Sequence, residues 1–528
     1  MSNDYISKIS LKNFKKFKES EFEFNPNLNV IIGENAAGKS SILQAIDIVL
    51  NQKGIDDRRF RNEYGMLMNK NAERAFIENP KISTLPKMEM IVYLNLSNDT
   101  PNHIFSGIGP DGQMSLFIKF EYSFDENFNT ELQSLIAEDN TSLVPYEFYK
   151  PSWETAIGSY HYRKNPLKSI VIDTDKADGD SFSSYKNQIY NSLSIKTQSQ
   201  LATKLKKQLS FYKDDITNLI GDDLHLQADP ARILVRDTLE IFSKDSPIPL
   251  RQEGSGVENI IKTKIALKSE SKLVLLEEPE NHLTFDLATQ QIQFILDLEK
   301  ANRQVILTTH NPLIVNRLNL KNVLLLTENR FLSLNSLDSN TAFYFSRLDN
   351  LNILQFMLAK KVILVEGPTE YVLMDTMFRV TTGKSLAEEG IHLLSMGGDH
   401  AKRFIEVAKK LGNKVLIITD NDGNDNRQES LTSMVNTSEN VRVSIPENKE
   451  HFTFEATLFY ANQEWFESKS WNHRSSKTEW GKHKNLPKEL VYLLNNKVDS
   501  ALEYDKSIEE KNISVPEYLH EDLKWFIK

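Results

Sequence analysis

Two acidic motifs in the C-terminal part of the chain have the residue types and spacing of a divalent-metal site. Residues 361–365 form an apolar run that ends on Glu366, and Glu370 follows after a Gly-Pro turn. A second apolar run ends in Asp420 and Asp422. Two such strand ends bring four carboxylates to one edge of a parallel sheet, where hard oxygen ligands suit Mg²⁺ or Mn²⁺. These ions stabilise the attacking and leaving oxygens of a phosphodiester. The alternative is two ordinary strand ends with solvated acids.

A phosphate-binding loop lies near the N-terminus. Residues 33–40 read G-x-x-x-x-G-K-S, between an apolar strand pattern at 27–32 and a helical pattern at 41–46. In such loops backbone N–H groups and the helix N-terminus face the phosphates, the lysine reaches the β and γ oxygens, and the serine holds Mg²⁺. We therefore predict an ATP site. The residues expected to contact the nucleotide or its Mg²⁺ are Gly33, Asn35, Gly38, Lys39, Ser40 and Ser41.

Two later segments have the pattern of an ATP-hydrolysing site. A strand pattern at 271–276 leads to Glu277, expected to bind the Mg²⁺ shell, and Glu278, expected to activate the attacking water. Another strand pattern ends on His310, placed to sense the γ-phosphate. Each also fits a plainer interpretation as a capped strand end or a core histidine.

A glycine-rich turn lies upstream of these strands, before a helix expected at 259–267. Its backbone is expected to contact a γ-phosphate across a dimer, and a simple helix-opening turn is the alternative. The turn residues are Gly254, Ser255 and Gly256.

The elements needed to position these residues follow from the hydrophobic patterns. Short apolar runs that alternate with helical patterns predict an α/β fold with two domains. We expect an ATPase domain at 1–345, with a helical arm inserted at about 150–245, and a metal-binding domain at 346–528 whose parallel sheet is flanked by helices.

Composition excludes several classes of protein. The chain has 528 residues, a net charge of -10 and no cysteine, which rules out disulfides and thiolate metal sites. Neither a signal-peptide pattern nor an apolar run of membrane-spanning length is present, so a cytoplasmic protein without a membrane partner is expected.

The negative net charge means that a nucleic-acid partner needs local basic patches. Residues 469–488 combine six cations with two tryptophans, which fits DNA contact, although a solvated lysine-rich loop is the alternative.

The motifs together resemble a known family. The Leu-Lys-Asn-Phe segment near the N-terminus, the phosphate loop, and the Glu-Glu-Pro-Glu-Asn-His-Leu and Thr-Thr-His-Asn-Pro segments resemble the ABC-type ATPases of recombination proteins, of the SMC and RecF kind. Followed by Leu-Val-Glu-Gly-Pro-Thr-Glu at 364–370 and Thr-Asp-Asn-Asp at 419–422, they resemble the overcoming lysogenization defect (OLD) family of ATP-binding Toprim endonucleases. That family includes the Gabija nuclease subunit and effectors encoded beside retrons.

The resemblance implies further site residues. It implies a third acidic position at Glu455, within a Thr-Phe-Glu segment, and a lysine beside the scissile phosphate at Lys497, for which a surface lysine on a helix is the alternative. It also implies that the inserted arm is a dimerisation element. Three features depart from the family pattern. Ala36 stands where glycine is common, Glu277 stands where aspartate is common, and the Gly-Ser-Gly turn at 254–256 differs from the Leu-Ser-Gly-Gly signature of transporters.

The metal and nucleotide motifs, together with the resemblance to the OLD family, imply an ATP-regulated, divalent-metal-dependent DNA endonuclease, and the resemblance implies a role in bacterial antiviral defence. The implied partners are DNA, a second copy of the chain, and a helicase or a retron reverse transcriptase with its RNA–DNA hybrid. A recombination-type ATPase that tethers DNA without cutting it is the main alternative. A topoisomerase or primase is disfavoured, because no nucleophilic tyrosine stands out and a zinc module is unexpected without cysteine.

Overall fold

The computed structural model describes most of the chain outside the region 174–254. The described residues are 4–52, 63–97, 103–110, 112–137, 143–160, 165–173, 190, 193–209, 213–214, 226–227, 229, 238–240, 242, 247–249, 255–268, 270–327, 330–347, 353–436, 438–468 and 478–527.

Two compact units divide the chain. The first comprises residues 1–31, 38–309 and 328–330, and the second comprises 32–37, 310–327 and 331–528. The boundary expected near residue 345 falls within helix α12 (Ser339–Arg347), which belongs to the second unit. Of the helices that the structure describes, none combines the length and apolar character needed to span a bilayer.

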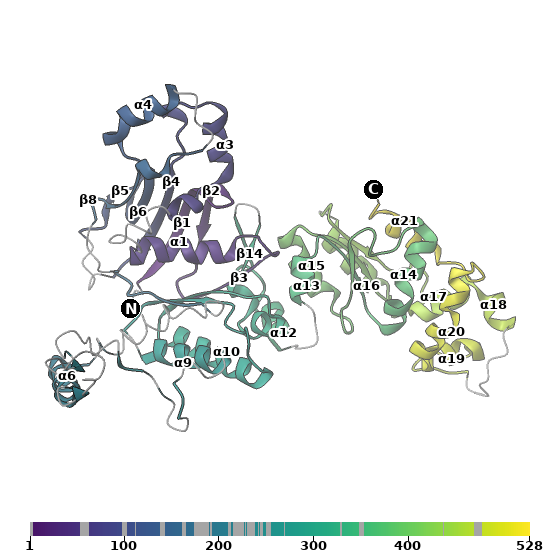
Figure 1. Cartoon of the computed structure of the whole chain (residues 1–528). Helices are drawn as coiled ribbons and strands as arrows, with labels where there is room; N and C mark the ends of the chain where they lie inside the picture. The colour runs from purple at the N-terminus through teal and green to yellow at the C-terminus, as the bar shows by residue number, and fades with distance from the viewer. Residues whose placement is uncertain are drawn as a thin grey trace. The chain divides into compact units, whose positions relative to one another are not determined.

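The first unit contains an antiparallel sheet in the order β2-β1-β4-β6-β7-β8, with β5 paired to β6 (Figure 1). β2 largely alternates buried and exposed residues, because one of its faces packs on the core, whereas β4 is buried along most of its length. The strands are β1 (Tyr5–Phe14), β2 (Phe17–Glu23), β4 (Met88–Asn95), β5 (Ser106–Ile108), β6 (Met114–Phe124), β7 (Tyr149–Thr155) and β8 (Gly158–Ser159). Two helices of this unit are α3 (Lys70–Glu78) and α4 (Asn129–Ala137).

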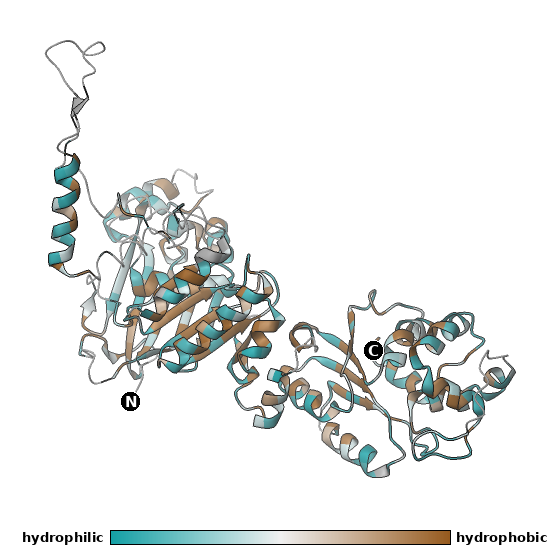
Figure 2. Ribbon diagram, turned by 90° about the horizontal axis from the view of Figure 1, so that it is seen from below, coloured by the Kyte–Doolittle hydropathy of each residue, from teal (hydrophilic) through white to brown (hydrophobic). Residues whose placement is uncertain are grey.

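Four parallel strands of the first unit pair in the order β3-β13-β12-β9. β3 and β13 are buried along their whole length, as expected for strands covered on both faces. Figure 2 shows apolar strands with helices whose outer faces are hydrophilic. The strands are β3 (Leu28–Ile32), β9 (Ile170–Asp173), β12 (Leu273–Glu277) and β13 (Gln304–Thr308), and the helices are α1 (Lys39–Asn51), α9 (Ser255–Lys268) and α10 (Phe285–Lys300).

The buried side chain of Gln304 joins the start of β13 to β1. Its Oε1 accepts a hydrogen bond from the Ile6 N–H at 2.8 Å, and its Nε2 donates to the Ile6 carbonyl at 2.8 Å and to the Asn25 carbonyl at 2.9 Å. All three polar contacts of this amide are therefore made inside the protein, which offsets the cost of burying it.

The region expected to form an arm differs in part from the prediction. β7 pairs with β6 in the antiparallel sheet, and β9 pairs with β12 in the parallel sheet, so residues 150–155 and 170–173 belong to the ATPase sheets. The helical character expected further on is present in α6 (Ile195–Leu209). Two short strands, β10 (Lys213–Asp214) and β11 (Leu226–Gln227), pair with each other.

The first part of the second unit carries short elements that precede the C-terminal sheet. They are α11 (Pro312–Arg317), β14 (Val323–Leu326), β15 (Phe331–Ser333), α12 and α13 (Ile353–Leu358). α11 packs against α12 and α13, and α12 packs onto α15 (Ala401–Leu411) through the rings of Phe345 and Phe404, whose centroids are 5.2 Å apart.

The C-terminal sheet is parallel throughout, in the order β17-β16-β18-β19. Its strands are β16 (Lys361–Val365), β17 (Ile391–Ser395), β18 (Lys414–Ile418) and β19 (Val441–Ser444). The remaining helices are α14 (Pro368–Thr382), α16 (Asp425–Val435), α17 (Phe454–Ala461), α18 (Gln463–Ser468), α19 (Lys488–Asn495), α20 (Lys497–Glu509) and α21 (Glu517–Lys524). The two strands predicted to deliver acids, β16 and β18, are therefore neighbours.

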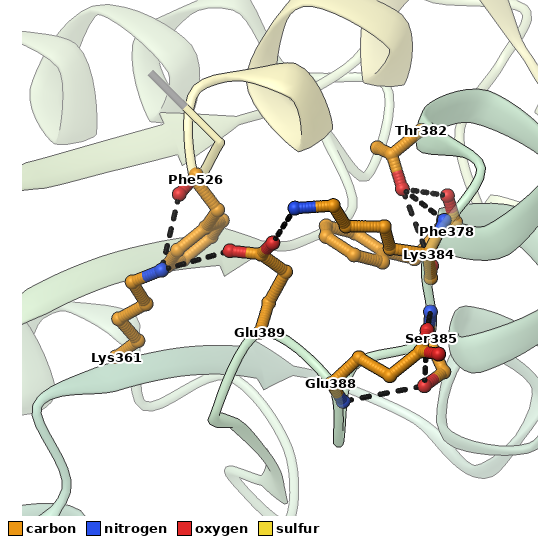
Figure 3. A network of polar contacts seen from close by, with 8 residues as sticks. All are labelled: Lys361, Phe378, Thr382, Lys384, Ser385, Glu388, Glu389 and Phe526. Atoms are coloured by element: carbon orange, nitrogen blue, oxygen red, sulfur yellow. Dashed lines mark hydrogen bonds and ion pairs between the residues drawn. The ribbon is translucent and has the colours of Figure 1, made fainter.

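A polar network holds the amino end of β16 (Figure 3). Lys361 Nζ lies 3.2 Å from Glu389 Oε2 and donates to the Phe526 carbonyl at 3.3 Å, and Glu389 also pairs with Lys384. Hydrogen bonds from both lysines lower the pKa of the Glu389 carboxyl. The network anchors the strand at the end opposite to its carboxyl edge, where Glu366 follows.

Candidate active site

The carboxyl edge of β16 and β18 brings three of the predicted acids into one polar cluster. Glu366 follows β16, and its Oε2 accepts hydrogen bonds from the Thr419 hydroxyl and, at 3.3 Å, from the Asp420 N–H. Asp420 and Asp422 follow β18, and Asp422 has a left-handed backbone with φ 50°. The pairing of β16 with β18 therefore places the two motifs side by side, as the sequence predicted.

Glu370 lies in the first turn of α14 and is 3% exposed. Its carboxylate lies over Gly367, the N-cap, since a Cβ added at Gly367 would be 2.8 Å from Glu370 Oε2. Burial and the nearby charge of Glu455 raise the pKa of Glu370 to about 7. Burial and the charges of Glu370 and Glu455 likewise raise the pKa of Asp420.

The buried Glu455 and the partly exposed Lys497 form an ion pair beside these acids. Glu455 lies in the first turn of α17, two residues after the N-cap Thr453, and its side chain is 1% exposed. Its Oε2 lies 3.0 Å from Lys497 Nζ, and its Oε1 accepts a 2.7 Å hydrogen bond from the Thr369 hydroxyl. Although burial opposes the charged form, Glu455, Asp420 and Glu370 raise the pKa of Lys497. Glu366, Glu370, Asp420, Glu455 and Lys497 thus form one interacting group.

A second cation, Arg427 on α16, pairs with the outer acids. Its guanidinium Nη2 lies 3.0 Å from Glu366 Oε2 and 3.0 Å from Asp399 Oδ1, and its Nη1 pairs with Asp422. Nη2 also donates to the Thr419 hydroxyl at 2.7 Å. Sequence reasoning missed Arg427, Asp399, Thr369 and Thr419. The available signal was a lone arginine on the helix that directly follows the Asp-x-Asp motif.

The donor set suits a hard divalent cation, since it consists of carboxylates. Burial, together with their mutual repulsion, already raises the pKa values of Glu370 and Asp420. In the part of the chain that the structure describes, no three carboxylate or imidazole side chains are already grouped as metal ligands. The outer acids are instead turned toward Arg427, and Glu455 is turned toward Lys497.

Part of the stretch predicted to contact DNA lies beside this edge. Lys482 Nζ donates to the Asp422 carbonyl at 3.3 Å, and its neighbour His483 stacks on Phe452 with 3.6 Å between ring centroids. Trp480 stacks on Phe452 at 6.0 Å. Residues 469–477, with the other tryptophan and several of the cations, lie outside the described residues.

The phosphate loop has the predicted local structure. It follows β3, and Gly38 has φ 103°, a conformation that glycine adopts without strain, before α1 begins at Lys39. Ala36 also has a left-handed backbone, with φ 60°. Lys39 is 5% exposed, and burial lowers its pKa while the charge of Glu278 opposes that shift. Asn35 and Ser40 are exposed, whereas Gly33 and Ser41 are buried.

The downstream acids stand at the carboxyl end of β12. Glu277 is its last residue and lies opposite Thr308 on β13. Glu278 has φ 42°, its N–H donates to the Thr308 carbonyl at 3.0 Å, and its Oε2 accepts from Asn281 Nδ2 at 2.9 Å. His310 belongs to the second unit and follows two residues after β13 in the chain.

The glycine-rich turn was predicted wrongly in one respect. α9 begins at Ser255, four residues before the predicted start at residue 259. Ser255 and Gly256 therefore lie in its first helical turn. Two glycines near one another weaken a helical pattern, which explains the late start that was predicted. Gly254 lies outside the described residues.

Two family models match the chain. The first, described as an AAA ATPase domain, matches residues 5–315, and the second, described as an overcoming lysogenization defect protein-like Toprim domain, matches residues 357–422.

Sequence relatives match only a short segment. The DNA replication and repair protein RecF of Lactococcus lactis subsp. lactis (strain IL1403) is 49% identical over 41 residues, which cover 8% of this chain and 12% of that protein. RecF of Streptococcus pneumoniae (strain CGSP14) is 48% identical over 42 residues, again 8% of this chain and 12% of that protein. The chain thus matches about an eighth of the length of these relatives.

Solved structures with a similar arrangement include the SMC head bound to the C-terminal winged-helix domain of ScpA, at 15% identity and TM-score 0.34, covering 61% of this chain and 94% of that chain. RecF bound to ATP has 12% identity and TM-score 0.32, covering 62% and 99%. The SMC head of Thermotoga maritima has 12% identity and TM-score 0.28, covering 61% and 94%. Likeness at this level carries no argument about function.

Proposed function

Since the chain belongs to the OLD family, with an AAA ATPase domain followed by an OLD-like Toprim domain, we propose that it is an ATP-regulated, divalent-metal-dependent DNA endonuclease. The observation that carries this proposal is the meeting of Glu366, Asp420 and Asp422 at the carboxyl edge of neighbouring parallel strands. Glu370 and Glu455, on the adjoining helices, complete the acidic group. The charge of Glu455 helps to raise the pKa of Glu370, and the charges of both help to raise the pKa of Asp420.

The residues that would hold Mg²⁺ or Mn²⁺ in the nuclease site are Glu366, Glu370, Asp420, Asp422 and Glu455. Bound there, such an ion would activate water and stabilise the leaving oxygen of a phosphodiester. Burial disfavours the charged form of Lys497, but the neighbouring carboxylates of Glu455, Asp420 and Glu370 outweigh it and raise the pKa of Lys497, so the lysine keeps its charge next to the acids. We assign it to the scissile phosphate, whose negative charge it would neutralise. Lys482 and the residues around it would guide the DNA strand toward the same edge.

The ATPase site would use the phosphate loop and the acids after β12. Lys39 and Ser40 would hold the phosphates and their Mg²⁺, together with Glu277, while Glu278 would activate water and His310 would sense the γ-phosphate. The N-terminus of α9, with Ser255 and Gly256, would reach a γ-phosphate of an opposing head. ATP hydrolysis would then require a homodimer or larger assembly.

The biological setting that the family favours is bacterial antiviral defence in the cytoplasm. The partners would be DNA and a defence protein such as a helicase or a retron reverse transcriptase with its RNA–DNA hybrid. Phosphodiester hydrolysis is downhill, so ATP has no need to drive it, and its role would be to switch the nuclease between active and inactive arrangements.

The test is DNA cleavage by the purified full-length protein. Plasmid and linear DNA are incubated with Mg²⁺ or Mn²⁺, with and without ATP. The double variant Asp420→Ala/Asp422→Ala should lose cleavage and keep ATP binding, because the altered acids lie at the edge of the C-terminal sheet.

The matched control is Glu509→Gln. This acid belongs to the same domain and is half-exposed in a surface pair with Arg379. It should cut DNA like the unmodified protein. Full cleavage by the double variant would refute the nuclease site, and a DNA-binding protein that never cuts would favour a tether.

A further inference from the structure

Arg427 forms ion pairs with three different acids. It approaches Glu366, Asp399 and Asp422 with its two terminal nitrogens, and its side chain is 9% exposed. It comes from the first turn of α16, which starts directly after the β18 loop behind the N-cap Asn424. The backbone that carries Asp420 and Asp422 therefore also delivers this guanidinium to them.

The oxygens that Arg427 contacts include those expected to bind the metal. Glu366 Oε2 is 3.0 Å from Nη2, and Asp422 Oδ2 pairs with Nη1. Each of these charge-assisted contacts uses lone pairs that a divalent cation requires. A metal ion and Arg427 would also repel each other at this distance. The two cations therefore compete for the same carboxylates.

We propose that Arg427 is an internal counter-cation that occupies the outer acids of the nuclease site and must leave Glu366 and Asp422 before a divalent ion binds them. Arg427 thereby sets the metal concentration at which the site loads. The inference rests on the proposed nuclease function and adds a regulatory element to it.

The contacts of Arg427 are suited to release. Its Nε is buried without a hydrogen-bond partner, so its polar contacts are incomplete in the paired position. Two of its three acids are more than half exposed, with side-chain exposures of 62% for Asp399 and 56% for Asp422. Ion pairs with exposed acids are weak. Asp399 is outside the predicted metal ligands and can keep the guanidinium paired after it leaves the others.

The first experiment measures Mn²⁺ affinity of the full-length protein without DNA or nucleotide, by the electron paramagnetic resonance signal of free Mn²⁺. Arg427→Gln should bind Mn²⁺ about tenfold more tightly, the effect of removing one charge-assisted contact. Arg427→Lys keeps the charge but loses the planar fork, so its affinity should lie between the two. Unchanged or weaker binding by Arg427→Gln would overturn the proposal.

Arg442→Gln is the matched control. This arginine of β19 pairs with Asp522 at 3.3 Å and stacks over Trp525, away from the acids of the site. Its removal should leave Mn²⁺ affinity unchanged. If neither the unmodified protein nor any variant binds Mn²⁺, the nuclease proposal fails. If all bind equally, only the role of Arg427 fails.

A second measurement needs no variant and does not depend on folding of Arg427→Gln. The unmodified protein is treated with an arginine-selective dicarbonyl reagent, and modification of Arg427 is followed by peptide mass spectrometry. Saturating Mn²⁺ should increase the modification rate of Arg427 and leave that of Arg442 unchanged. Equal or stronger protection of Arg427 by Mn²⁺ would overturn the proposal.

Discussion

The Tyr344 ring of α12 packs against the His400 imidazole at the start of α15, with 4.5 Å between the ring centroids. Arg403 lies over the same tyrosine at 4.4 Å and donates to the Asn340 carbonyl at 2.8 Å. His400 is the neighbour of Asp399, which pairs with Arg427. α12 also packs against α11, which begins two residues after His310. One helix of the second unit thus contacts both the segment after His310 and the loop beside the acids.

Tyr344→Ala is predicted to separate nucleotide binding from DNA cleavage. Loss of the ring removes the contact through which α12 positions His400 and Asp399. Allosteric couplings are typically about 5- to 150-fold, and we expect the effect of ATP on the cleavage rate to disappear while ATP hydrolysis continues. Cleavage and hydrolysis are measured in parallel across an ATP titration.

Phe343→Ala on the same helix is the control, because Phe343 is 59% exposed. It should retain the response to ATP. A Tyr344→Ala protein with the same ATP response as the unmodified one would exclude this route.

A pH dependence follows from Glu370, whose pKa is raised by burial and by Glu455 from 4.5 to about 7. The folded protein then binds the Glu370 proton more tightly than the unfolded protein does. The contribution of this proton to the free energy of unfolding is therefore fully present below about pH 4.5, and it is lost as the pH rises through about 7. Metal binding needs the ionised carboxylate and should strengthen over the same interval. Without divalent ions, the melting temperature should fall between these pH values, and Mg²⁺ should oppose that fall.

Glu370→Gln should flatten this part of the melting profile, since the glutamine has no proton to lose. Thermal melts at several pH values, with and without Mg²⁺, measure the effect. An identical profile for the variant would assign the titration to another group.

Lys39→Ala and Glu278→Gln are predicted to change DNA cleavage in opposite directions at cellular ATP concentrations. The first removes a buried lysine of the phosphate loop and should weaken nucleotide binding. The second keeps the hydrogen-bonding shape near Asn281 but loses the carboxylate, and should trap bound ATP. Nucleotide shifts cleavage only if it binds the active and inactive arrangements with different affinities.

Cleavage rates across an ATP titration distinguish these cases, with Lys300→Ala on α10 as a surface control whose lysine is 70% exposed. Equal cleavage by the unmodified protein and both variants, at every ATP concentration, would leave two independent activities on one chain.

Local patterns predicted the strands that deliver the site, because each is a short apolar run that ends on an acid. β16 and β18 are found at the expected residues, and their pairing brings Glu366 next to Asp420. Glu455 and Lys497 lie 3.0 Å apart although they come from different helices, and the family resemblance singled out both. Their roles in catalysis stay predictions.

Other features depend on tertiary contacts that no local pattern encodes. α16 is a polar helix, and nothing in its periodicity distinguishes Arg427 from a solvated arginine. β9 has only four residues, and it is a strand because it pairs with β12 across a long insertion. The start of α9 was placed too late because Gly256 lowers helix propensity, while the structure continues the helix through it.

The pairing of β3 with β13 has a consequence for synthesis of the protein on the ribosome. Leu28 lies opposite Val305, and the Gln304 side chain binds Ile6, which is 298 positions away in the chain. β3, the strand before the phosphate loop, therefore cannot pair with β13 until more than half of the polypeptide has left the ribosome. Contacts this distant in sequence form slowly and leave strand edges open to aggregation. The β16–β19 sheet closes within a much shorter stretch of chain, between residues 361 and 444. Expression at lower temperature or with chaperones should therefore improve the yield of the N-terminal unit more than that of the isolated C-terminal sheet.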